Sequence, residues 1–272
     1  HMLLQLLLFT GFKGKAVLHM RELFKQYSTV YIVYSVLFRY HSASVIAISR
    51  AVRDSLPKSL RKQCRVIYNG VEVPKATGYK PSVPAAYPQF LYLGRVVPWK
   101  GCDLLIEAFD LLVNKYQETA GTLAIIGGTF YWNTSYRRTL VEKIQFCNLD
   151  KVITLHDYDS DPGKIYMNHS ILCMPSDQEP FGRAAAEAMA YGLPVIGFNS
   201  GGLSEVVENH ESGLLGQERT PEVFCALMEH FIVHPSEIVR MGANGRQRCI
   251  RLFNKKTQIP KIADAIINTT KE

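Results

Sequence analysis

The sequence predicts an α/β protein with a doubly wound parallel sheet, and three observations predict this class. From about residue 88 onward, short apolar runs alternate with amphipathic stretches. The apolar runs lack regular polar alternation, as expected of strands that are covered on both faces. Each run is followed by a stretch with helical periodicity. This order is typical of a parallel sheet with helices on both sides.

The expected strands of this part share short apolar runs bounded by turn residues, and they are residues 89–94, 122–127, 151–156, 171–175 and 193–198. The expected helices between them have apolar residues at helical spacing, and they are residues 102–116, 135–146, 163–169 and 183–191. After Gly213 the pattern predicts helices only, over 221–232, 236–253 and 256–269. We therefore expect a five-stranded sheet followed by a helical C-terminal part.

The first 72 residues differ from the rest of the chain. Their expected strands are residues 16–20, 44–49 and 64–70, with helices over 29–40 and 50–61. Three strands are few for an independent α/β domain. The opening apolar run is too short to span a bilayer, and we expect it to be a core element whose neighbours are missing.

The expected division of the chain has four parts, because composition and periodicity change at their boundaries. These are an incomplete N-terminal α/β domain (1–72), a linker rich in Pro and Ala (73–88), a ligand-binding domain (89–255) and a C-terminal helix (256–272). We expect this last helix to pack back on the N-terminal part.

The net charge of +7 is unevenly distributed along the chain. Residues 1–70 carry 11 Lys and Arg against two acids, whereas the remaining residues carry 20 against 22. Either this is a basic solvated face, or it contacts an anionic membrane leaflet or a phosphate-bearing substrate. No reader motif for nucleic acid accompanies the charge. The six cysteines form no CxxC pair or Cys/His cluster, which predicts reduced thiols, no metal site and a cytoplasmic protein.

The first candidate ligand-binding loop is "GRVVPWKG" (94–101), which directly follows an expected strand. In open α/β sheets, ligands bind at the carboxyl ends of the strands. Arg95 and Lys100 leave this one loop, and an Arg fork beside a Lys point charge suits a diphosphate. The alternative is that they are two surface cations beside a turn.

The second candidate is "EPFGRAAAE" (179–187), at an expected helix start. Free N–H groups around Phe181, Gly182 and Arg183 would face the ligand, with the positive end of the helix dipole behind them. Glu179 and Glu187 would lie about 12 Å apart, too far to cleave one bond together. This spacing suits two anchors on one long ligand. The alternative is that one acid caps the helix while the other is solvated.

Two further stretches are weak signals when taken alone. The first is "IIGG" (125–128), where Gly127 ends an expected strand. The second is "NSGGLSEVVEN" (199–209), a Gly-Gly turn that leads into a helix. Turns of both kinds are common in α/β proteins.

In this order and spacing, the four stretches resemble the donor half of a retaining glycosyltransferase of family 4. The family pattern GR-x4-KG stands here as "GRVVPWKG" and its E-x7-E segment as "PSDQEPFGRAAAEAMAYGLPV". The "IIGG" and "GGLSEVVENHESG" stretches match its other two motifs. The resemblance is dense over residues 88–235. It implies a GT-B architecture whose C-terminal domain is Rossmann-like, with an incomplete N-terminal domain, and we expect the chain to be a shortened form.

The resemblance also implies roles for individual residues. Arg95 and Lys100 would neutralise the donor diphosphate, and the N–H groups of Phe181 and Gly182 would bind the sugar or its phosphate. Glu179 would accept hydrogen bonds from sugar hydroxyls, and Glu187 from the ribose. Three further residues are implied to bind the donor: Gly94, Gly127 and Arg183. His19 matches the family's active-site histidine, and the alternative for it is a purely structural histidine at a strand end.

The implied function is metal-independent transfer of a hexose, with retention, from a UDP- or GDP-sugar to a glycan or lipid-linked acceptor, without a cofactor. The expected location is the cytoplasm, with peripheral contact at the membrane face. One departure is "LHDYDSD" (155–161), where the family usually has a glycine and contacts the nucleobase. A nucleotide-sugar-binding module without turnover remains an alternative, and a nucleotide-sugar epimerase is a third interpretation.

Overall fold

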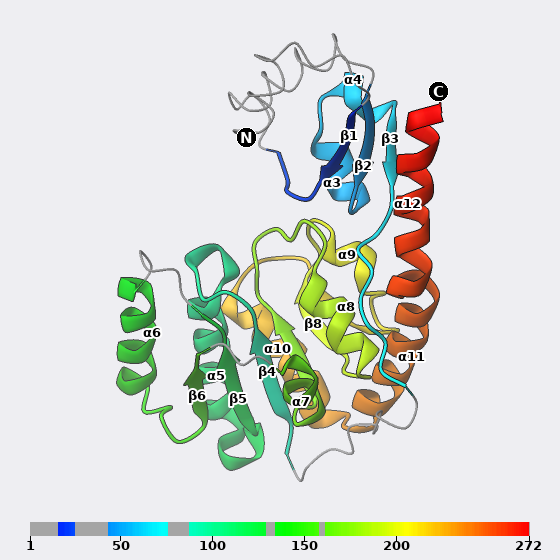
Figure 1. Cartoon of the computed structure of the whole chain (residues 1–272). Helices are drawn as coiled ribbons and strands as arrows, with labels where there is room; N and C mark the ends of the chain where they lie inside the picture. The colour runs from blue at the N-terminus through cyan, green and yellow to red at the C-terminus, as the bar shows by residue number, and fades with distance from the viewer. Residues whose placement is uncertain (1–15, 25–42, 76–86, 129–133, 158–160, 272) are drawn as a thin grey trace.

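The computed structural model describes residues 16–24, 43–75, 87–128, 134–157 and 161–271. These residues form two separate parallel sheets (Figure 1). The smaller sheet has the order β1-β2-β3, from β1 (Ala16–Met20), β2 (Ala43–Ala47) and β3 (Cys64–Val66). We call residues 16–24 and 43–69 the first unit, and residues 87–252 the second unit.

The second unit contains the larger sheet, with the order β6-β5-β4-β7-β8-β9. Its strands are β4 (Gln89–Leu93), β5 (Thr122–Ile126), β6 (Ile153–His156), β7 (Ile171–Met174), β8 (Val195–Phe198) and β9 (Gly213–Gly216). Counted from β4 along the chain, this order is 3-2-1-4-5-6, the Rossmann arrangement. The chain winds outward from β4 in one direction and then returns to continue from β7 in the other. The junction of β4 and β7 is therefore the topological switch point.

Strand β9 corrects the sequence prediction, which placed only helices after Gly213. Residues 213–216 pair in parallel with β8 at the edge of the sheet. A Cβ atom on Gly213 would lie 2.0 Å from the carbonyl oxygen of Val195, so only glycine allows the two backbones to approach this closely. Glycine disfavours strands by propensity. The glycine content of residues 213–216 is therefore the reason why the sequence did not predict this fully buried strand.

Helices cover both faces of the larger sheet. One core contains side chains from α5 (Cys102–Tyr116), α6 (Thr134–Phe146) and α10 (Pro221–Val233). The other core contains side chains from α7 (Pro162–Met167), α8 (Arg183–Ala190) and α9 (Leu203–Val206). Helix α11 (Ser236–Leu252) packs on α8. The predicted doubly wound fold is confirmed.

Burial of the strands on both faces explains why their sequences are apolar without polar alternation. On β4, Phe90 and Tyr92 belong to one core while Leu91 belongs to the other. Every residue of β7 and β8 is buried. Because both faces of these central strands are covered, each position requires an apolar side chain.

The first unit also departs from the prediction in one place. The expected helix over 50–61 is divided into α3 (Arg50–Ser55) and α4 (Lys58–Arg61). The break falls at Leu56, which has extended backbone with ψ of 159°. It precedes Pro57, and a residue before proline disfavours the helical conformation. The expected helix over 29–40 and most of the expected linker lie outside the described residues.

Helix α12 (Lys255–Lys271) runs from the second unit along the first (Figure 1). Ala265 packs with Ile46 of β2 and with Ile67, which directly follows β3. The Thr269 hydroxyl donates a hydrogen bond of 2.7 Å to Ser44 Oγ. The C-terminal segment is therefore a physical part of the first unit's core. Within the described ranges, no helix combines the length and the apolar character needed to cross a membrane.

The chain passes between the units twice, and the two crossings are hydrogen-bonded to each other. The N–H of Val71 donates to the carbonyl of Phe253 at 2.8 Å, and the N–H of Lys255 donates to the carbonyl of Val71 at 2.9 Å. The ring of Phe253 also packs edge-on against Tyr68 of the first unit at 5.3 Å and Phe181 of the second at 5.5 Å. One aromatic cluster therefore joins both units at the crossing.

Phe253→Ala should lower the free energy of unfolding by about 3–5 kcal/mol, because it leaves a cavity inside this cluster. Phe253 is fully buried, whereas Phe146 is 87% exposed. Phe146→Ala is therefore the matched control and should change stability by less than about 0.5 kcal/mol. Denaturant unfolding measures both variants. Equal effects in the two would show that the cluster does not stabilise the chain.

Candidate functional site

A cavity of about 800 Å³ lies at the switch point of the larger sheet. Its second-unit wall is made by the loop after β4, the loop after β7 and the start of α8. Arg21, Glu22, Ile48 and Asn69 line it from the first unit. Parallel strands bring their carboxyl ends to one edge, and diverging connections leave a crevice where the winding direction reverses. The position of the cavity follows from the strand order.

The loop after β4 places two cations beside an indole ring. Lys100 Nζ lies 4.3 Å from the centre of the Trp99 ring, and the Arg95 guanidinium carbon lies 5.8 Å from it. Both distances are within the range of cation–π attraction. All three residues line the cavity, and Trp99 is 40% exposed. The ring therefore gathers both positive charges on one side of the cavity.

Glu179, in the loop after β7, is 5% exposed, and its carboxylate is held on one oxygen. Oε1 forms an ion pair with Lys100 Nζ and accepts a 2.7 Å hydrogen bond from the Ser176 hydroxyl. The Lys100 side chain is only 15% exposed in this pair. A buried carboxylate requires such partners, because desolvation of an unpaired charge is costly. The pair thus joins the β4 and β7 loops.

Helix α8 begins at the cavity without a side-chain cap. Gly182, its N-cap residue, has φ of +92°, and no side chain of the described residues caps the first turn. The first intrahelical bond runs from the N–H of Ala186 to the carbonyl of Gly182. Phe181, Gly182 and Arg183 all line the cavity. The unpaired N–H groups of a first turn, with the helix dipole behind them, attract anions.

Glu187, one turn further along α8, is oriented by two partners. Its Oε1 accepts a 2.7 Å bond from Arg183 Nε, and its Oε2 accepts a 3.2 Å bond from the Tyr166 hydroxyl. Tyr166 is buried and stacks on Tyr191 at 5.3 Å. Burial, and then the negative charge of Glu187, raise the pKa of Tyr166 well above its usual range. The phenol therefore stays protonated and donates.

The structure brings most of the predicted site residues to this one cavity. The predicted residues that line it are Gly94, Arg95, Lys100, Glu179, Phe181, Gly182, Arg183 and Glu187. Sequence reasoning missed Tyr166 and Trp99. The only available signal for Trp99 was its place inside the GR-x4-KG loop, and Tyr166 lay unremarked in an expected helix. The chemical roles assigned to the predicted residues stay predictions.

Two predicted residues are absent from the cavity lining. Gly127 lies beneath it, where a Cβ atom would be 1.7 Å from the carbonyl oxygen of Gly94. Its neighbour Gly128 is the lining residue. His19 is exposed on β1, and partial desolvation of the ring followed by the charge of Arg21 lowers its pKa. The role of His19 stays a prediction. Within the described ranges, no cluster of three or more His, Cys, Asp or Glu is placed to hold a metal ion.

Comparison with known proteins agrees with this geometry. The family model described as "Glycosyl transferases group 1" matches residues 80–248, more than half of the chain. The chain belongs to the group 1 glycosyl transferases. An uncharacterized glycosyltransferase of Methanocaldococcus jannaschii is 29% identical over 218 residues, which cover 79% of this chain and 56% of that protein.

A capsular polysaccharide biosynthesis glycosyltransferase, CapM of Staphylococcus aureus, is 26% identical over 79% of this chain and 59% of its own length. The chain thus spans less than two thirds of either relative. Among solved structures, Anabaena HepE in complex with UDP and glucose matches with a TM-score of 0.82 and 22% identity. That match covers 92% of this chain and 70% of HepE.

The sucrose-phosphate synthase of Thermosynechococcus elongatus also matches, with a TM-score of 0.82 and 24% identity, over 97% of this chain and 70% of that one. At this identity the likeness concerns the fold. The expected GT-B architecture, with a Rossmann-like C-terminal domain, is confirmed.

Lys100→Met should lower the free energy of unfolding by about 3–5 kcal/mol, because it leaves the Glu179 carboxylate buried without its cation. Lys143 pairs with Glu107 on the surface, where Glu107 is 47% exposed. Lys143→Met should therefore cost at most about 1 kcal/mol. Denaturant unfolding compares the two.

The double variant Lys100→Met, Glu179→Gln should recover part of the loss, because the unpaired charge is then removed. Additive effects of the two substitutions would show that the Lys100–Glu179 pair is not coupled.

Proposed function

We propose that the cavity binds a nucleoside diphosphate sugar, and that the chain acts in a metal-independent, retaining transfer of its hexose, as in family 4. The acceptor is a glycan or a lipid-linked glycan. One observation carries this proposal: two cations, an uncapped helix start and two oriented glutamates line a single cavity. Their chemistry matches the diphosphate, the sugar and the ribose of one ligand.

The diphosphate is assigned to Arg95, Lys100 and the start of α8. The guanidinium offers a planar fork of donors, the ammonium a point charge, and the helix start its free N–H groups. Lys100 is already paired with Glu179, so its position is fixed before any ligand arrives. Fixed donors of this kind stabilise charge without the cost of reorganising during the reaction. Together these groups supply the positive charge that a divalent cation would otherwise provide, which is why we propose no metal.

The two glutamates are assigned to opposite ends of the ligand. Both bonds that Glu179 accepts end on Oε1, which leaves Oε2 to accept a sugar hydroxyl. Glu187 is held by Tyr166 and Arg183, and its lone pairs suit the two hydroxyls of a ribose. Solved complexes of the structural relative HepE contain UDP with glucose and also UDP-glucose, which supports a UDP-hexose donor. A GDP-sugar remains the alternative donor.

The reaction follows from the separation of charge. The bond between the sugar's anomeric carbon and the diphosphate oxygen breaks, and its electron pair leaves with the diphosphate. An acceptor hydroxyl forms the new bond on the face from which the diphosphate departs, so that configuration is retained. The departing diphosphate takes up the hydroxyl proton. Arg95, Lys100 and the α8 start stabilise the charge that develops on the leaving group.

A second candidate is a nucleotide-sugar-binding module that does not turn over on its own. The observation that favours it is that the chain covers only 56–59% of the length of the two relatives compared above. Assays of donor hydrolysis and of transfer by the 272-residue chain separate the two candidates. Turnover by this chain removes the binding module as an explanation. Tight donor binding without turnover favours it.

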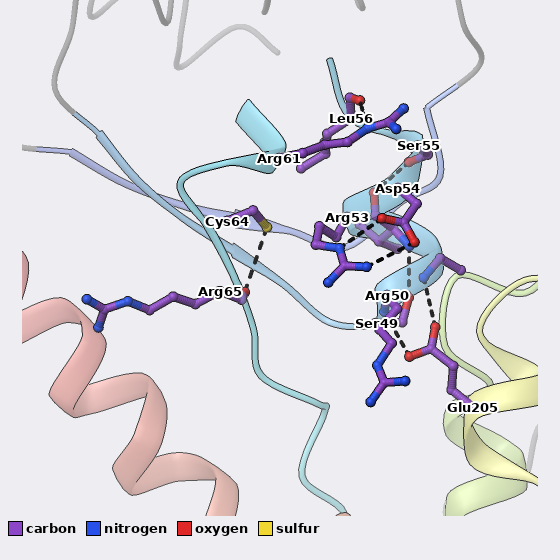
Figure 2. Close-up of polar contacts among 12 residues, drawn as sticks. Ser49, Arg50, Arg53, Asp54, Ser55, Leu56, Arg61, Cys64, Arg65 and Glu205 are labelled. Atoms are coloured by element: carbon purple, nitrogen blue, oxygen red, sulfur yellow. Dashed lines mark hydrogen bonds and ion pairs between the residues drawn. The ribbon is translucent and has the colours of Figure 1, made fainter. Parts of the chain in front are cut away.

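We further propose peripheral contact with an anionic membrane surface at the cytoplasmic face. Residues 50–65 carry six cations and one acid, Asp54. Figure 2 shows four of these cations, Arg50, Arg53, Arg61 and Arg65, around α3 and β3. Such a cluster is attracted to acidic lipid head groups within about 8 Å at physiological salt. The cytoplasmic location itself stays a prediction.

Calorimetry with UDP-, GDP- and ADP-sugars tests the donor assignment. Glu187→Gln and Tyr166→Phe should each weaken binding of the preferred donor, Glu187→Gln by about tenfold or more, because a charge-assisted hydrogen bond is lost. Glu229 provides a matched control, because it also accepts a tyrosine hydroxyl, from Tyr116, and an ion pair. Glu229→Gln and Tyr116→Phe should leave donor affinity unchanged. Absence of binding to every donor would overturn the proposal.

Co-sedimentation with vesicles that contain an acidic phospholipid tests the membrane contact. The triple change Lys58→Glu, Lys62→Glu, Arg65→Glu should abolish binding, since each cation near the surface contributes about 1 kcal/mol. Arg138, Lys151 and Lys164 are exposed cations of the second unit. Their reversal to Glu changes the net charge equally and should leave binding intact. Binding that is indifferent to acidic lipid or to added salt would contradict the proposal.

A further inference from the structure

The Gly-Gly turn at residues 201–202 and the helix that follows it lie outside the cavity lining, yet they contact the loop that carries Glu179. The N–H of Gly202 donates a 2.6 Å hydrogen bond to the carbonyl oxygen of Glu179. A Cβ atom on Gly202 would lie 2.7 Å from the Cα of Phe181, so a larger residue would displace the loop. This segment therefore supports the β7–α8 loop from behind.

Glu205, in the same segment, reaches across to the first unit. Its carboxylate accepts the backbone N–H groups of Arg50 at 2.8 Å and Ala51 at 2.7 Å, as Figure 2 shows for Arg50. These are the first two residues of α3, and their N–H groups have no partner inside the helix. The Tyr68 hydroxyl of the first unit donates to the same carboxylate at 3.2 Å. Three donors of the first unit thus converge on one side chain of the second.

Burial, followed by the negative charge of Glu205, raises the pKa of Tyr68, so its phenol stays protonated as a donor. The carboxylate also lies at the positive end of the α3 dipole, where negative charge is stabilising. The Glu205 carboxylate therefore meets a hydroxyl donor and a helix start that both suit an acceptor.

Ser49 forms a second link at the same helix start. Its Oγ accepts the N–H of Val52 at 3.0 Å and so caps α3. The same hydroxyl donates to the carbonyl oxygen of Pro180, inside the loop between Glu179 and Phe181. Ser49 is completely buried. The start of α3 is therefore bonded both to the donor-binding loop and to the helix behind that loop.

Helix α12 attaches the first unit from another side, because it packs on β2 and β1. Figure 1 shows α12 alongside the small sheet, with α3 turned toward α9. A body attached along one side only can tilt about that attachment. The contact at the start of α3 adds a second attachment and fixes the orientation of the first unit over the cavity.

We propose that Glu205 is a positioning residue that docks the start of α3 on the second unit and thereby holds the Glu179–Phe181 loop in its donor-binding conformation. Glu205 acts through Ser49 and Pro180 and does not touch the ligand. The effect on donor affinity rests on the proposed function, whereas the docking itself does not.

Amide hydrogen exchange on the 272-residue chain tests the docking without any ligand. In Glu205→Ala, exchange at Arg50 and Ala51 should become about tenfold faster or more, because both N–H groups lose their acceptor. Exchange should also rise in the segment 179–182. Glu205→Gln keeps one acceptor oxygen and should give an intermediate rate, which covers the case in which the alanine variant folds poorly.

Glu208 offers a matched control two residues past α9. It pairs with Arg248 inside the second unit, and its side chain is 52% exposed. Glu208→Ala should leave exchange at Arg50, Ala51 and the 179–182 segment unchanged. The inference is overturned if Glu205→Ala also leaves them unchanged, or if Glu208→Ala accelerates them equally.

Calorimetry with the preferred nucleotide sugar tests the effect on the site. Glu205→Ala and Ser49→Ala should each raise the donor Kd by about three- to tenfold. The double variant should raise it by less than the product of the two, because both changes release the same contact. Multiplicative effects would contradict a shared docking. If the unmodified chain binds no nucleotide sugar, the proposed function fails, and the exchange at residues 179–182 alone decides the inference.

Discussion

The backbone of residues 179–181 is restrained from both units, and the site depends on this restraint. Gly202 donates to the carbonyl of Glu179 from behind, and Ser49 donates to the carbonyl of Pro180 from the first unit. The Phe181 ring is fixed in the aromatic cluster. With its backbone held in this way, the Glu179 carboxylate meets Lys100, and α8 begins at the cavity without a side-chain cap from the described residues.

Strand order explains why the remaining groups gather at the same place. β4 and β7 are neighbours in the sheet, although 77 residues lie between the end of β4 at Leu93 and the start of β7 at Ile171. Their loops leave the same edge in opposite directions, so Arg95 and Glu179 face one crevice. The first unit closes this crevice with Arg21, Glu22, Ile48 and Asn69. A binding cavity made from both units requires a fixed orientation of one unit relative to the other. Side chains that lie outside the cavity provide this orientation.

The sequence predicted best what local physics determines. Central strands buried on both faces need apolar residues throughout, so they could be predicted from their apolar runs. The candidate ligand-binding residues could be predicted because they lie in the loops that follow these strands. The prediction failed where a distant partner decides the structure. Gly213 forms a strand because Val195 lies beside it, and Glu187 is oriented by Tyr166, 21 positions away. Glu205 accepts a hydrogen bond from Arg50, 155 positions away in the sequence, and the periodicity of a sequence does not predict such a contact.

The paired crossings at Val71 and Phe253 have a mechanical consequence. Because both covalent connections run through one hydrogen-bonded point, the angle between the units is set by contacts away from that point, at the start of α3. Gly70 sits at this point, where a Cβ atom would come within 2.6 Å of the Lys255 backbone. A larger residue at position 70 would therefore push the two crossings apart and displace the cavity wall that the first unit supplies.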